Sequence, residues 1–509
     1  MRLTKIVQRA NFSKKKYLIP LLLLLLHTTT YADNNKFIVS YRVETLGEVS
    51  NGELSPLWFT ANRFGTMGVA DKQANLRTGL FGSKKFKHNW KIDTGVELVG
   101  GSETTSKFWV HQAFFDVSWK KLNLSIGNKE RFDFPLTKNT ALTSGWMVEG
   151  MNTRPIPQIR LSIDDYLPIP GMKNWLAFKG HLAYGWFTDG KWQKDYVDIN
   201  NNYVQDVLYH SKSLMFRIGN KKIVPLELEF GVQMAAQFGG DMYYKNPDGS
   251  SSLVINLPKG LKAYWKAFAP QPGDENSLLA EQLNIEGNIL GSWNFALNWY
   301  AGNWKTRVYL EHYFEDPSQI LWEYGRWKDG LLGIEITLPK NRFISSILWE
   351  GMGTKDQTSP VFVRDKEGPF PDISMRGDDN YYNHYLYQSW QQYGLGIGHP
   401  LIPGPIYTQN GTLNFRSNRA KIQHIGLQGS PSEQISWRIL ASFASHWGIY
   451  RNPLDKERKQ TSCLLEVVYK PSWTKGWSVS ASLGLDRGDY PGDSTGGMLS
   501  ICKKGDFSL

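Results

Sequence analysis

Between Trp477 and Asp486 every second residue of the chain is apolar, and the residues between them are small or polar. Successive side chains of a β-strand face opposite sides, so this segment has one apolar and one polar face. Residues 90–98, 115–120 and 435–443 show the same alternation, with charged residues in mid-strand. A soluble sandwich also alternates, but its strands are usually about 5–6 residues long and seldom carry such charges. The pattern therefore favours an all-β fold, a transmembrane antiparallel β-barrel.

The length of the chain indicates the size of the barrel. At roughly 25–28 residues per strand and loop, residues 33–509 make about 18 strands, within the even numbers known for outer-membrane barrels. We find no linker rich in Pro, Gly or Ser and predict that residues 33–509 form a single domain. Residues 133–172, 241–276 and 354–380 are broken by Gly, Pro or Asp. We expect them to be long loops at the outer surface or inside the lumen, where they would occlude it.

The first 32 residues have the features of a cleavable export signal. Six basic residues and no acidic residue precede Asp33, an apolar run covers residues 17–26, and residues 30–32 offer a cleavage site. The apolar run is too short to span a bilayer as a helix. No later stretch has about 18 uninterrupted apolar residues, so helical spans are not expected. We therefore predict export to the bacterial outer membrane.

Composition narrows the function further. Without the predicted signal, 52 Lys and Arg stand against 47 Asp and Glu, a net charge of +5. Nucleic-acid binding, which needs a concentrated basic patch, is not expected. The 20 Trp, 24 Tyr and 25 Phe suit aromatic belts at the membrane interfaces or platforms for sugar rings. Cys463 and Cys502 are expected to be free or independently buried thiols, because the strand at residues 477–486 would separate them by more than a disulfide spans. A disulfide, natural in an oxidising compartment, is the alternative.

Patterns for catalysis and metal binding are weak. Residues 311–316, Glu-His-Tyr-Phe-Glu-Asp, offer carboxylates of the kind that glycosidases use. On a strand Glu311 and Glu315 share one face, and hydrogen bonding in the lumen explains them better. The ten histidines lack metal-ligand spacing, and residues such as His210 and His424 are expected to be hydrogen-bonded in the wall. The oxygen ligands of the acidic loop at residues 378–380 suit calcium, but a tight turn explains the same residues equally well. We predict no enzymatic activity, no cofactor and no metal site.

Side chains suited to sugars gather in two places. Pyranose rings pack their C–H faces on Trp or Tyr, and their hydroxyls bond to Asp, Asn or Arg. The densest set lies at residues 378–387, and a second set flanks the Pro-Ile-Pro turn at residues 155–157. Loop packing or plugging of the lumen would explain both sets equally. The candidate polysaccharide-binding residues are Asn152, Arg154, Asp378, Asp379, Asn380, Tyr381, Tyr382 and Tyr385.

Several motifs resemble those of the Wzi-type capsule-assembly outer-membrane proteins, in the form common among Bacteroidetes-like bacteria. The opening motif is SPLWFTANRFG at residues 55–65. The most specific signature is LTSGWM at residues 142–147, followed by NTRPIPQI at residues 152–159. Shorter motifs follow in order at residues 208–212, 287–293, 313–318, 328–331, 379–383 and 398–401. Residues 36–49 depart from the enterobacterial members, because they read as extended chain where those members carry a periplasmic helical bundle.

The resemblance implies an outer-membrane barrel that acts as a lectin, holding capsular or extracellular polysaccharide at the cell surface without chemistry on it. Its partners would be that polysaccharide, outer-membrane lipid and polysaccharide-export machinery. Two alternatives stay open. The barrel alone suggests a porin or transporter, which needs an open lumen. An outer-membrane enzyme acting on glycan or lipid would need a catalytic pair that the sequence does not reveal.

Overall fold

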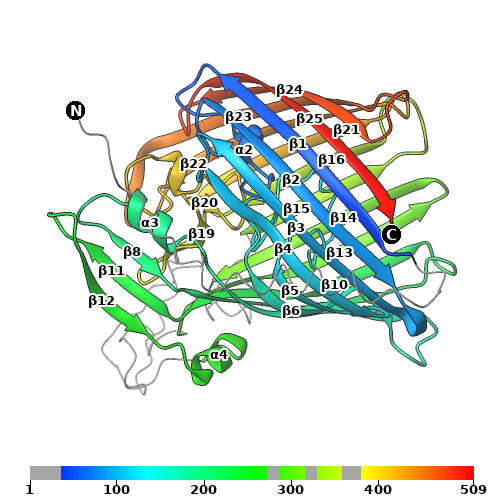
Figure 1. Cartoon of the computed structure of the whole chain (residues 1–509), viewed down its shortest axis with the longest axis horizontal. Coiled ribbons are helices and arrows are strands. Elements are labelled where there is room, and N and C mark those ends of the chain that lie inside the picture. The colour runs from blue at the N-terminus through cyan, green and yellow to red at the C-terminus, as the bar shows by residue number, and fades with distance from the viewer. Residues whose placement is uncertain (1–35, 272–285, 316–328, 358–379) are drawn as a thin grey trace.

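The computed structural model describes residues 36–271, 286–315, 329–357 and 380–509. Its main feature is a sheet of 18 antiparallel strands that closes on itself (Figure 1). Strand β1 pairs with β25 from Ile38↔Ser508 to Ser50↔Gly496, so no edge is left unpaired, as lipid requires. The predicted barrel of about 18 strands is confirmed. The strands are β1 (Ile38–Ser50), β2 (Lys72–Lys85), β3 (Trp90–Ser102), β4 (Phe108–Trp119), β5 (Leu122–Asn128), β6 (Gln158–Pro168), β7 (Leu176–Trp186), β9 (Leu208–Ile218), β10 (Leu226–Phe238), β13 (Asn288–Ala301), β14 (Trp304–Glu315), β15 (Gly330–Thr337), β16 (Ser346–Gly353), β21 (Ala420–Gly429), β22 (Ile435–Gly448), β23 (Pro453–Tyr469), β24 (Trp477–Gly488) and β25 (Ser494–Ser508).

The alternation of the sequence separates the two faces of this wall. On β2, Gln73 and Asn75 are buried toward the lumen, whereas Leu76 and Leu80 are 52% and 55% exposed on the outside. On β24, Asp486 is buried, while Leu483 points outward and is 64% exposed. Polar residues inside and apolar residues outside are the pattern of a barrel surrounded by lipid. Among the described residues, no helix is long and apolar enough to cross a membrane.

The two ends of the barrel differ. Short connections and both ends of the described chain lie at the right in Figure 1. The short connection between β2 and β3 holds the 3₁₀ turn η1 (Lys87–Asn89). Long connections lie at the left. Outer-membrane barrels have short turns on the periplasmic side and long loops on the outside. We therefore call the two ends the turn end and the outer end.

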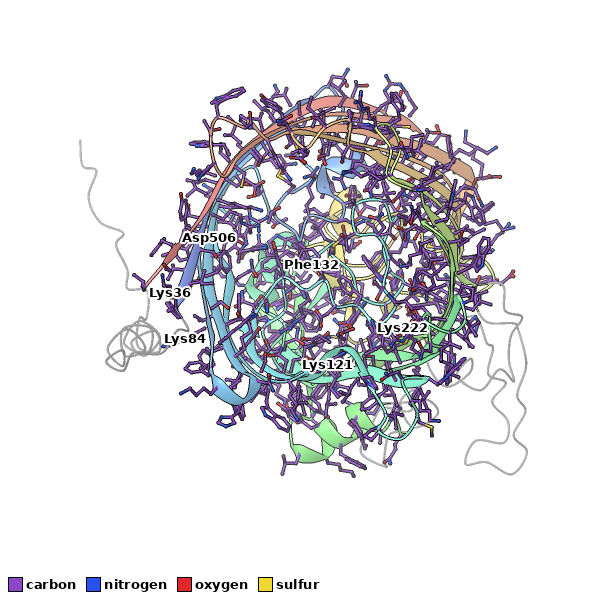
Figure 2. The ribbon with its side chains drawn as sticks, turned by 90° about the vertical axis from the view of Figure 1, so that its right-hand side faces the viewer. Lys36, Lys84, Lys121, Phe132, Lys222 and Asp506 are labelled. Carbon is purple, nitrogen blue, oxygen red and sulfur yellow. The ribbon has the colours of Figure 1, made fainter. Side chains whose placement is uncertain are left out.

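Three of the long connections pack against the inner face of the wall. We call residues 51–71, 129–157 and 380–419 the lumen segments. They contain the short helices α2 (Leu57–Thr60) and η3 (Pro405–Tyr407) and the two-residue strands β17 (Asn383–His384), β18 (Gln388–Ser389), β19 (Gln391–Gln392) and β20 (Leu395–Gly396). Figure 2 views the barrel from the turn end and shows ribbon inside the ring of strands, with Phe132 near the centre. Among the described residues, the largest buried hydrophobic cluster forms where these segments meet, around Trp390, Tyr382 and Phe59.

The other long connections build structure at the outer end. A separate sheet combines β8 (Asn202–Gln205), β11 (Gly240–Lys245) and β12 (Ser251–Leu257). Helix α3 (Gly190–Tyr196) precedes β8, and helix α4 (Leu261–Phe268) follows β12.

Two of the predicted loops are partly regular structure. Residues 133–172 include strand β6, because the proline-rich turns end before Gln158 and the alternation then resumes. Residues 241–276 include β11, β12 and α4, since their Gly and Asp residues form tight turns between short elements. The predicted loop at residues 354–380 lies largely outside the described residues, as does the predicted signal at residues 1–32.

The cysteine prediction is confirmed. Cys463 lies on β23 and Cys502 on β25, and β24 runs between these two strands. Both thiols are free.

Candidate functional site

The lumen segment 129–157 is fixed to the wall through buried carboxylates. Glu350 of β16 accepts hydrogen bonds from the Thr143 hydroxyl at 2.8 Å and from the Ser144 backbone N–H at 2.6 Å. Glu311 of β14 accepts from the Met147 N–H at 2.9 Å, and its other oxygen lies 2.5 Å from the Lys138 Nζ. Charges this deeply buried persist only when they are paired and hydrogen-bonded, so these contacts hold the segment in one place.

The same segment crosses the lumen. Near its start, Asp133 pairs with Arg160 of β6 at 3.0 Å. The segment then reaches β14 and β16 through the contacts above. Further along, Glu149 accepts hydrogen bonds from Ser211 of β9 at 2.7 Å and from Gln233 of β10 at 2.8 Å. Between these points the Ala141 carbonyl accepts from Arg438 of β22 at 2.9 Å. Strand β22 lies on the side of the 18-stranded ring opposite β6, so the segment reaches across the barrel.

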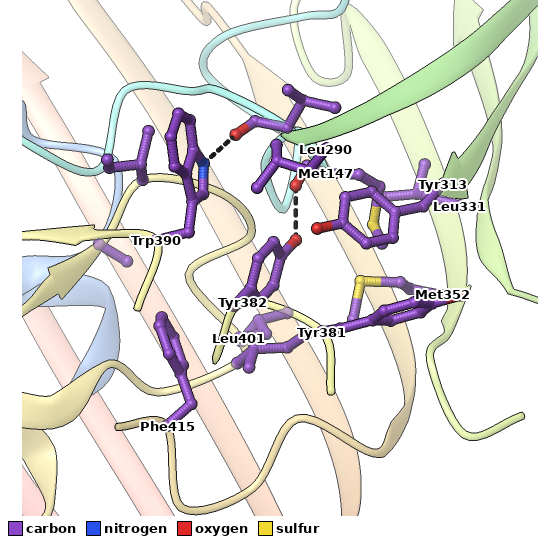
Figure 3. Packing of buried hydrophobic residues seen from close by; sticks show 14 of the residues in the cluster. Met147, Leu290, Tyr313, Leu331, Met352, Tyr381, Tyr382, Trp390, Leu401 and Phe415 are labelled. Carbon is purple, nitrogen blue, oxygen red and sulfur yellow. Dashed lines mark hydrogen bonds between the residues drawn. The ribbon is translucent and has the colours of Figure 1, made fainter. Parts of the chain in front are cut away.

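Residues 380–419 pack on this crossing segment (Figure 3). The Tyr382 hydroxyl donates to the Met147 carbonyl, and the Trp390 indole N–H donates to the Val148 carbonyl at 2.8 Å. The Tyr382 backbone N–H donates to Glu315 of β14 at 2.6 Å. The two segments and the wall therefore form one hydrogen-bonded unit.

Four of the predicted polysaccharide-binding residues are buried in this unit. Asn152 donates to the Gly396 carbonyl at 2.8 Å, and Tyr381 donates to Asp329 at 3.2 Å. Arg154 is 6% exposed, and Tyr382 is 1% exposed. In this conformation their side chains serve packing and hydrogen bonding between segments.

The remaining candidates are placed differently. The side-chain oxygen of Asn380 accepts from Asn418 at 2.6 Å. The ring of Tyr385 is 49% exposed and stacks on His384, with 4.7 Å between the ring centroids. Asp378 and Asp379 lie outside the described residues. Of the predicted aromatic cluster, Tyr385 therefore presents an accessible ring, whereas Tyr381 and Tyr382 are enclosed.

A stacked row of side chains lies at the outer end. The Arg154 guanidinium lies between the rings of Trp109 and Tyr393, 4.0 Å from each ring centroid. The Trp192 ring lies 6.2 Å from Tyr393 and stacks on Tyr196 of α3 at 4.6 Å and 15°. We call these five residues the aromatic row. Its Trp109 and Arg154 end is buried, and its Tyr393, Trp192 and Tyr196 end is half-buried, so the latter can offer rings to a ligand.

Arg154 links the row to the lumen segments. Its Nη2 donates to the Thr105 hydroxyl at 2.5 Å, at the outer ends of β3 and β4. Burial lowers the pKa of Arg154 to about 10, so the guanidinium stays charged at neutral pH. A charged, planar group between two aromatic faces is stabilised by their quadrupoles. The segment carrying Arg154 is thereby held to Tyr393 of another lumen segment.

A small cavity adjoins the row inside the barrel. Its volume is about 70 Å³. Two of its cations are paired, Arg160 with Asp133 and Lys129 with Asp116. Its charged lining consists of Lys129, Arg131, Arg154, Arg160, Asp133 and Glu149.

The carboxylates that raised the question of catalysis are hydrogen-bonded in the lumen, as expected. Glu311 and Glu315 share the inner face of β14 and accept N–H groups of the lumen segments. Asp316 lies outside the described residues. His424 likewise is a hydrogen-bonded wall residue, 2.8 Å from the Ser442 hydroxyl and 2.7 Å from the Leu142 carbonyl. These side chains act as fixed anchors of the lumen segments.

One group of side chains has the composition of a metal site. Glu97, His111 and Glu130 bring their ligand atoms within 4.8 Å of one another. Arg77 lies 2.8 Å from Glu97 and 2.6 Å from Glu130, and Arg42 also pairs with Glu97. The two guanidinium groups balance both carboxylates, so these side chains form a charge-neutral ion-pair network.

The rings of the aromatic row were missed by the sequence analysis. Trp109, Trp192 and Tyr393 come from three segments that are far apart in the chain. No local spacing links them, because the row exists only after the lumen segments fold back against β4 and α3.

Comparisons with known proteins place the fold. No family model and no curated protein matches the sequence. Among solved structures, the chain is similar to Wzi, an Escherichia coli outer-membrane protein of group 1 capsule assembly described as a carbohydrate-binding β-barrel. The identity is 14%, the TM-score is 0.56, and the match covers 92% of this chain and 85% of Wzi. Lower TM-scores, 0.46 and 0.45, relate it to Acinetobacter baumannii OccAB4 and Pseudomonas aeruginosa OprD, each 8% identical. These matches cover 93% and 94% of this chain, and 98% and 96% of those chains. The likeness to Wzi is one of fold, the closed barrel of outer-membrane proteins.

Proposed function

We propose that the protein is a non-enzymatic, lectin-like outer-membrane barrel of the Wzi type that binds capsular or extracellular polysaccharide at the cell surface. The carrying observation is the aromatic row at the outer end, fixed by Arg154 to segments that cross the lumen. Stacked, half-buried rings on a rigid support are suited to the C–H faces of sugar rings. The proposal agrees with the motifs that resemble the Wzi-type proteins.

The lumen segments favour a lectin over a porin. A diffusion channel needs a continuous aqueous path, and here residues 129–157 lie across the barrel on buried anchors at Glu311, Glu350 and Glu149. The proposal is that these segments occlude the lumen and carry the binding surface. A glycan-acting enzyme is disfavoured, because Glu311 and Glu315 are engaged with backbone N–H groups rather than facing an open cleft.

Within this proposal the candidate residues divide into two roles. The rings of Trp192, Tyr196 and Tyr385 meet the polymer, and Asp378, Asp379 and Asn380 bond its hydroxyls. Buried residues position the segments that carry these groups; they are Asn152, Arg154, Tyr381 and Tyr382. Export machinery at the turn end and outer-leaflet lipid around the wall complete the proposed partners.

The experiment is a calorimetric titration of the detergent-folded protein with surface polysaccharide from its own strain, with unrelated capsules as controls. We expect saturable binding and no shortening of the polymer on gel filtration. Replacing Trp192 and Tyr196 by Ala should weaken binding about five- to tenfold, from about 1–1.5 kcal/mol for lost stacking. The matched control is Trp473→Ala, an exposed Trp of the connection between β23 and β24 at the turn end. Equal affinities for all capsules, or loss of affinity in the control alone, would contradict the proposal.

A further inference from the structure

Helix α4 lies outside the ring of strands (Figures 1 and 2) and contacts β9 and β10. Its Tyr264 ring packs on Tyr184 of β7 and Phe238 of β10, with centroids 5.2 and 5.1 Å apart. The Tyr184 hydroxyl donates to the Tyr264 carbonyl at 2.9 Å. The helix is therefore attached to the outward, lipid-facing side of the strands near their outer ends.

The wall under α4 differs from its surroundings. His210 and Lys212 of β9 alternate with Ser211 and Ser213, which face the lumen, so the two basic side chains point outward. Phe268 of α4 lies over both: its carbonyl accepts from the Lys212 Nζ, and its ring lies 6.2 Å from His210. His210 is 1% exposed. The helix thus shields polar groups that would otherwise face lipid.

The covered patch lies at the level of the apolar belt. In the register of β7 and β9, Lys212 is opposite Leu182, and Leu208 is opposite Trp186. Leu182 and Trp186 point outward and are 36% and 49% exposed. An exposed Leu and an exposed Trp on the adjacent strand therefore bracket the height at which α4 packs. Trp is characteristic of the membrane–water interface.

The opposite face of α4 is apolar and open. Leu261 and Trp265 are spaced i, i+4 on this face and are 90% and 58% exposed, while Ala263 and Ala267 are buried against the protein. Phe268 lies at the edge between the two faces: its ring covers Lys212 and His210 of the wall, and it stays 37% exposed. Large apolar side chains gathered on one face of a short helix, at the level of an existing apolar belt, are the features of an interfacial helix.

We propose that α4 lies in the interface of the outer leaflet, with Leu261 and Trp265 among the lipid acyl chains and Phe268 at the edge between lipid and wall. The helix extends the lipid-facing surface of the barrel over the basic patch on β9. Because only residues 258–260 separate β12 from α4, the helix also ties the sheet of β8, β11 and β12 to the membrane surface. The proposal needs the barrel to sit in a bilayer and does not depend on polysaccharide binding.

Depth-dependent fluorescence quenching tests this proposal. Cys463 and Cys502 are replaced by Ala, and Leu261→Cys is labelled with an environment-sensitive fluorophore. The protein is folded into phosphatidylcholine vesicles that contain lipid spin-labelled near the headgroup or deep in the acyl chain. Leu80→Cys on the outward face of β2 is the lipid control. Lys191→Cys on α3, whose side chain is 86% exposed, is the water control.

We expect the Leu261 label to be quenched at least about half as strongly as the Leu80 label, and more by the shallow than by the deep spin label. The Lys191 label should be quenched weakly by both. Because Leu261 makes few contacts with the protein, its replacement should leave the heat-modifiable gel mobility of the folded barrel unchanged. Trp265→Cys provides a second position with the same expected profile. Quenching of both α4 labels no stronger than that of Lys191 would overturn the proposal.

Discussion

Glu350 is the wall residue whose change should most directly release the crossing segment. Its carboxylate accepts from Thr143, Ser144 and Tyr309 and lies 3.7 Å from the Lys138 Nζ. Glu350→Gln keeps the shape but removes the charge and turns an amide N–H₂ toward these donors. Breaking a buried charged pair costs about 3–5 kcal/mol, and we expect about 3 kcal/mol, because Lys138 keeps Glu311 at 2.5 Å.

Hydrogen exchange followed by mass spectrometry measures this release. At about 1.4 kcal/mol per tenfold, the Ser144 and Met147 amides should exchange about a hundredfold faster in Glu350→Gln, while amides of β24 keep their protection. The matched control is Glu44→Gln, an inward-facing residue of β1 that accepts from Ser500 on the neighbouring strand. Exchange in Glu350→Gln within about threefold of the wild type would refute the assignment of Glu350 as an anchor.

Three further predictions concern single residues. Tyr382→Phe removes the buried bond to the Met147 carbonyl and should lower the free energy of unfolding by about 1–2 kcal/mol, whereas Tyr385→Phe on an exposed ring should change it by less than about 0.5 kcal/mol in denaturant titrations. Arg154→Lys should weaken polysaccharide binding about three- to tenfold in calorimetry, because an ammonium group cannot stack between Trp109 and Tyr393. Burial raises the pKa of Asp329 to about 6, so the folded state binds a proton more tightly than the unfolded state. Protonated Asp329 stabilises the fold by at most about 3 kcal/mol; this contribution is present below pH 4 and is lost as the pH rises through 6. Asp329→Asn should therefore flatten the pH dependence of the free energy of unfolding between pH 4 and 6.

Each of these predictions has an opposing result. A Tyr385→Phe loss equal to that of Tyr382→Phe would mean that the hydroxyl bond to Met147 is not the cause. Unchanged polysaccharide binding in Arg154→Lys would mean that the aromatic row does not contribute to binding the ligand. If the wild type and Asp329→Asn had the same pH dependence of unfolding, the titration would belong to another group.

The barrel was predictable because its signal is local. The alternation that begins at Trp477 determines which face of β24 meets lipid. Because the period is two, a shift of one residue would turn every polar side chain toward lipid. The strand number followed from chain length, since each membrane crossing needs a similar number of residues. The short elements β11, β12 and α4 were harder to predict from the sequence, because turn residues between them dominate the local pattern.

The candidate site depends on contacts between distant residues, which the sequence does not display. Tyr381 and Tyr382 suit sugar binding and loop packing equally, and their burial follows from partners such as Met147, 235 residues away in the chain. The aromatic row joins rings from three separate segments through Arg154. Arg154 was singled out beside its Pro-Ile-Pro turn, but its stacking partners could not be inferred from that turn.

The central claim is that the lumen segments fill the barrel and leave its outer end as a binding surface. Single-channel recording of the wild-type protein in planar bilayers tests this claim most directly. We predict insertion without steady conductance, and brief openings that become more frequent in Glu350→Gln. A stable, ohmic conductance in the wild-type protein would contradict the account and favour a porin.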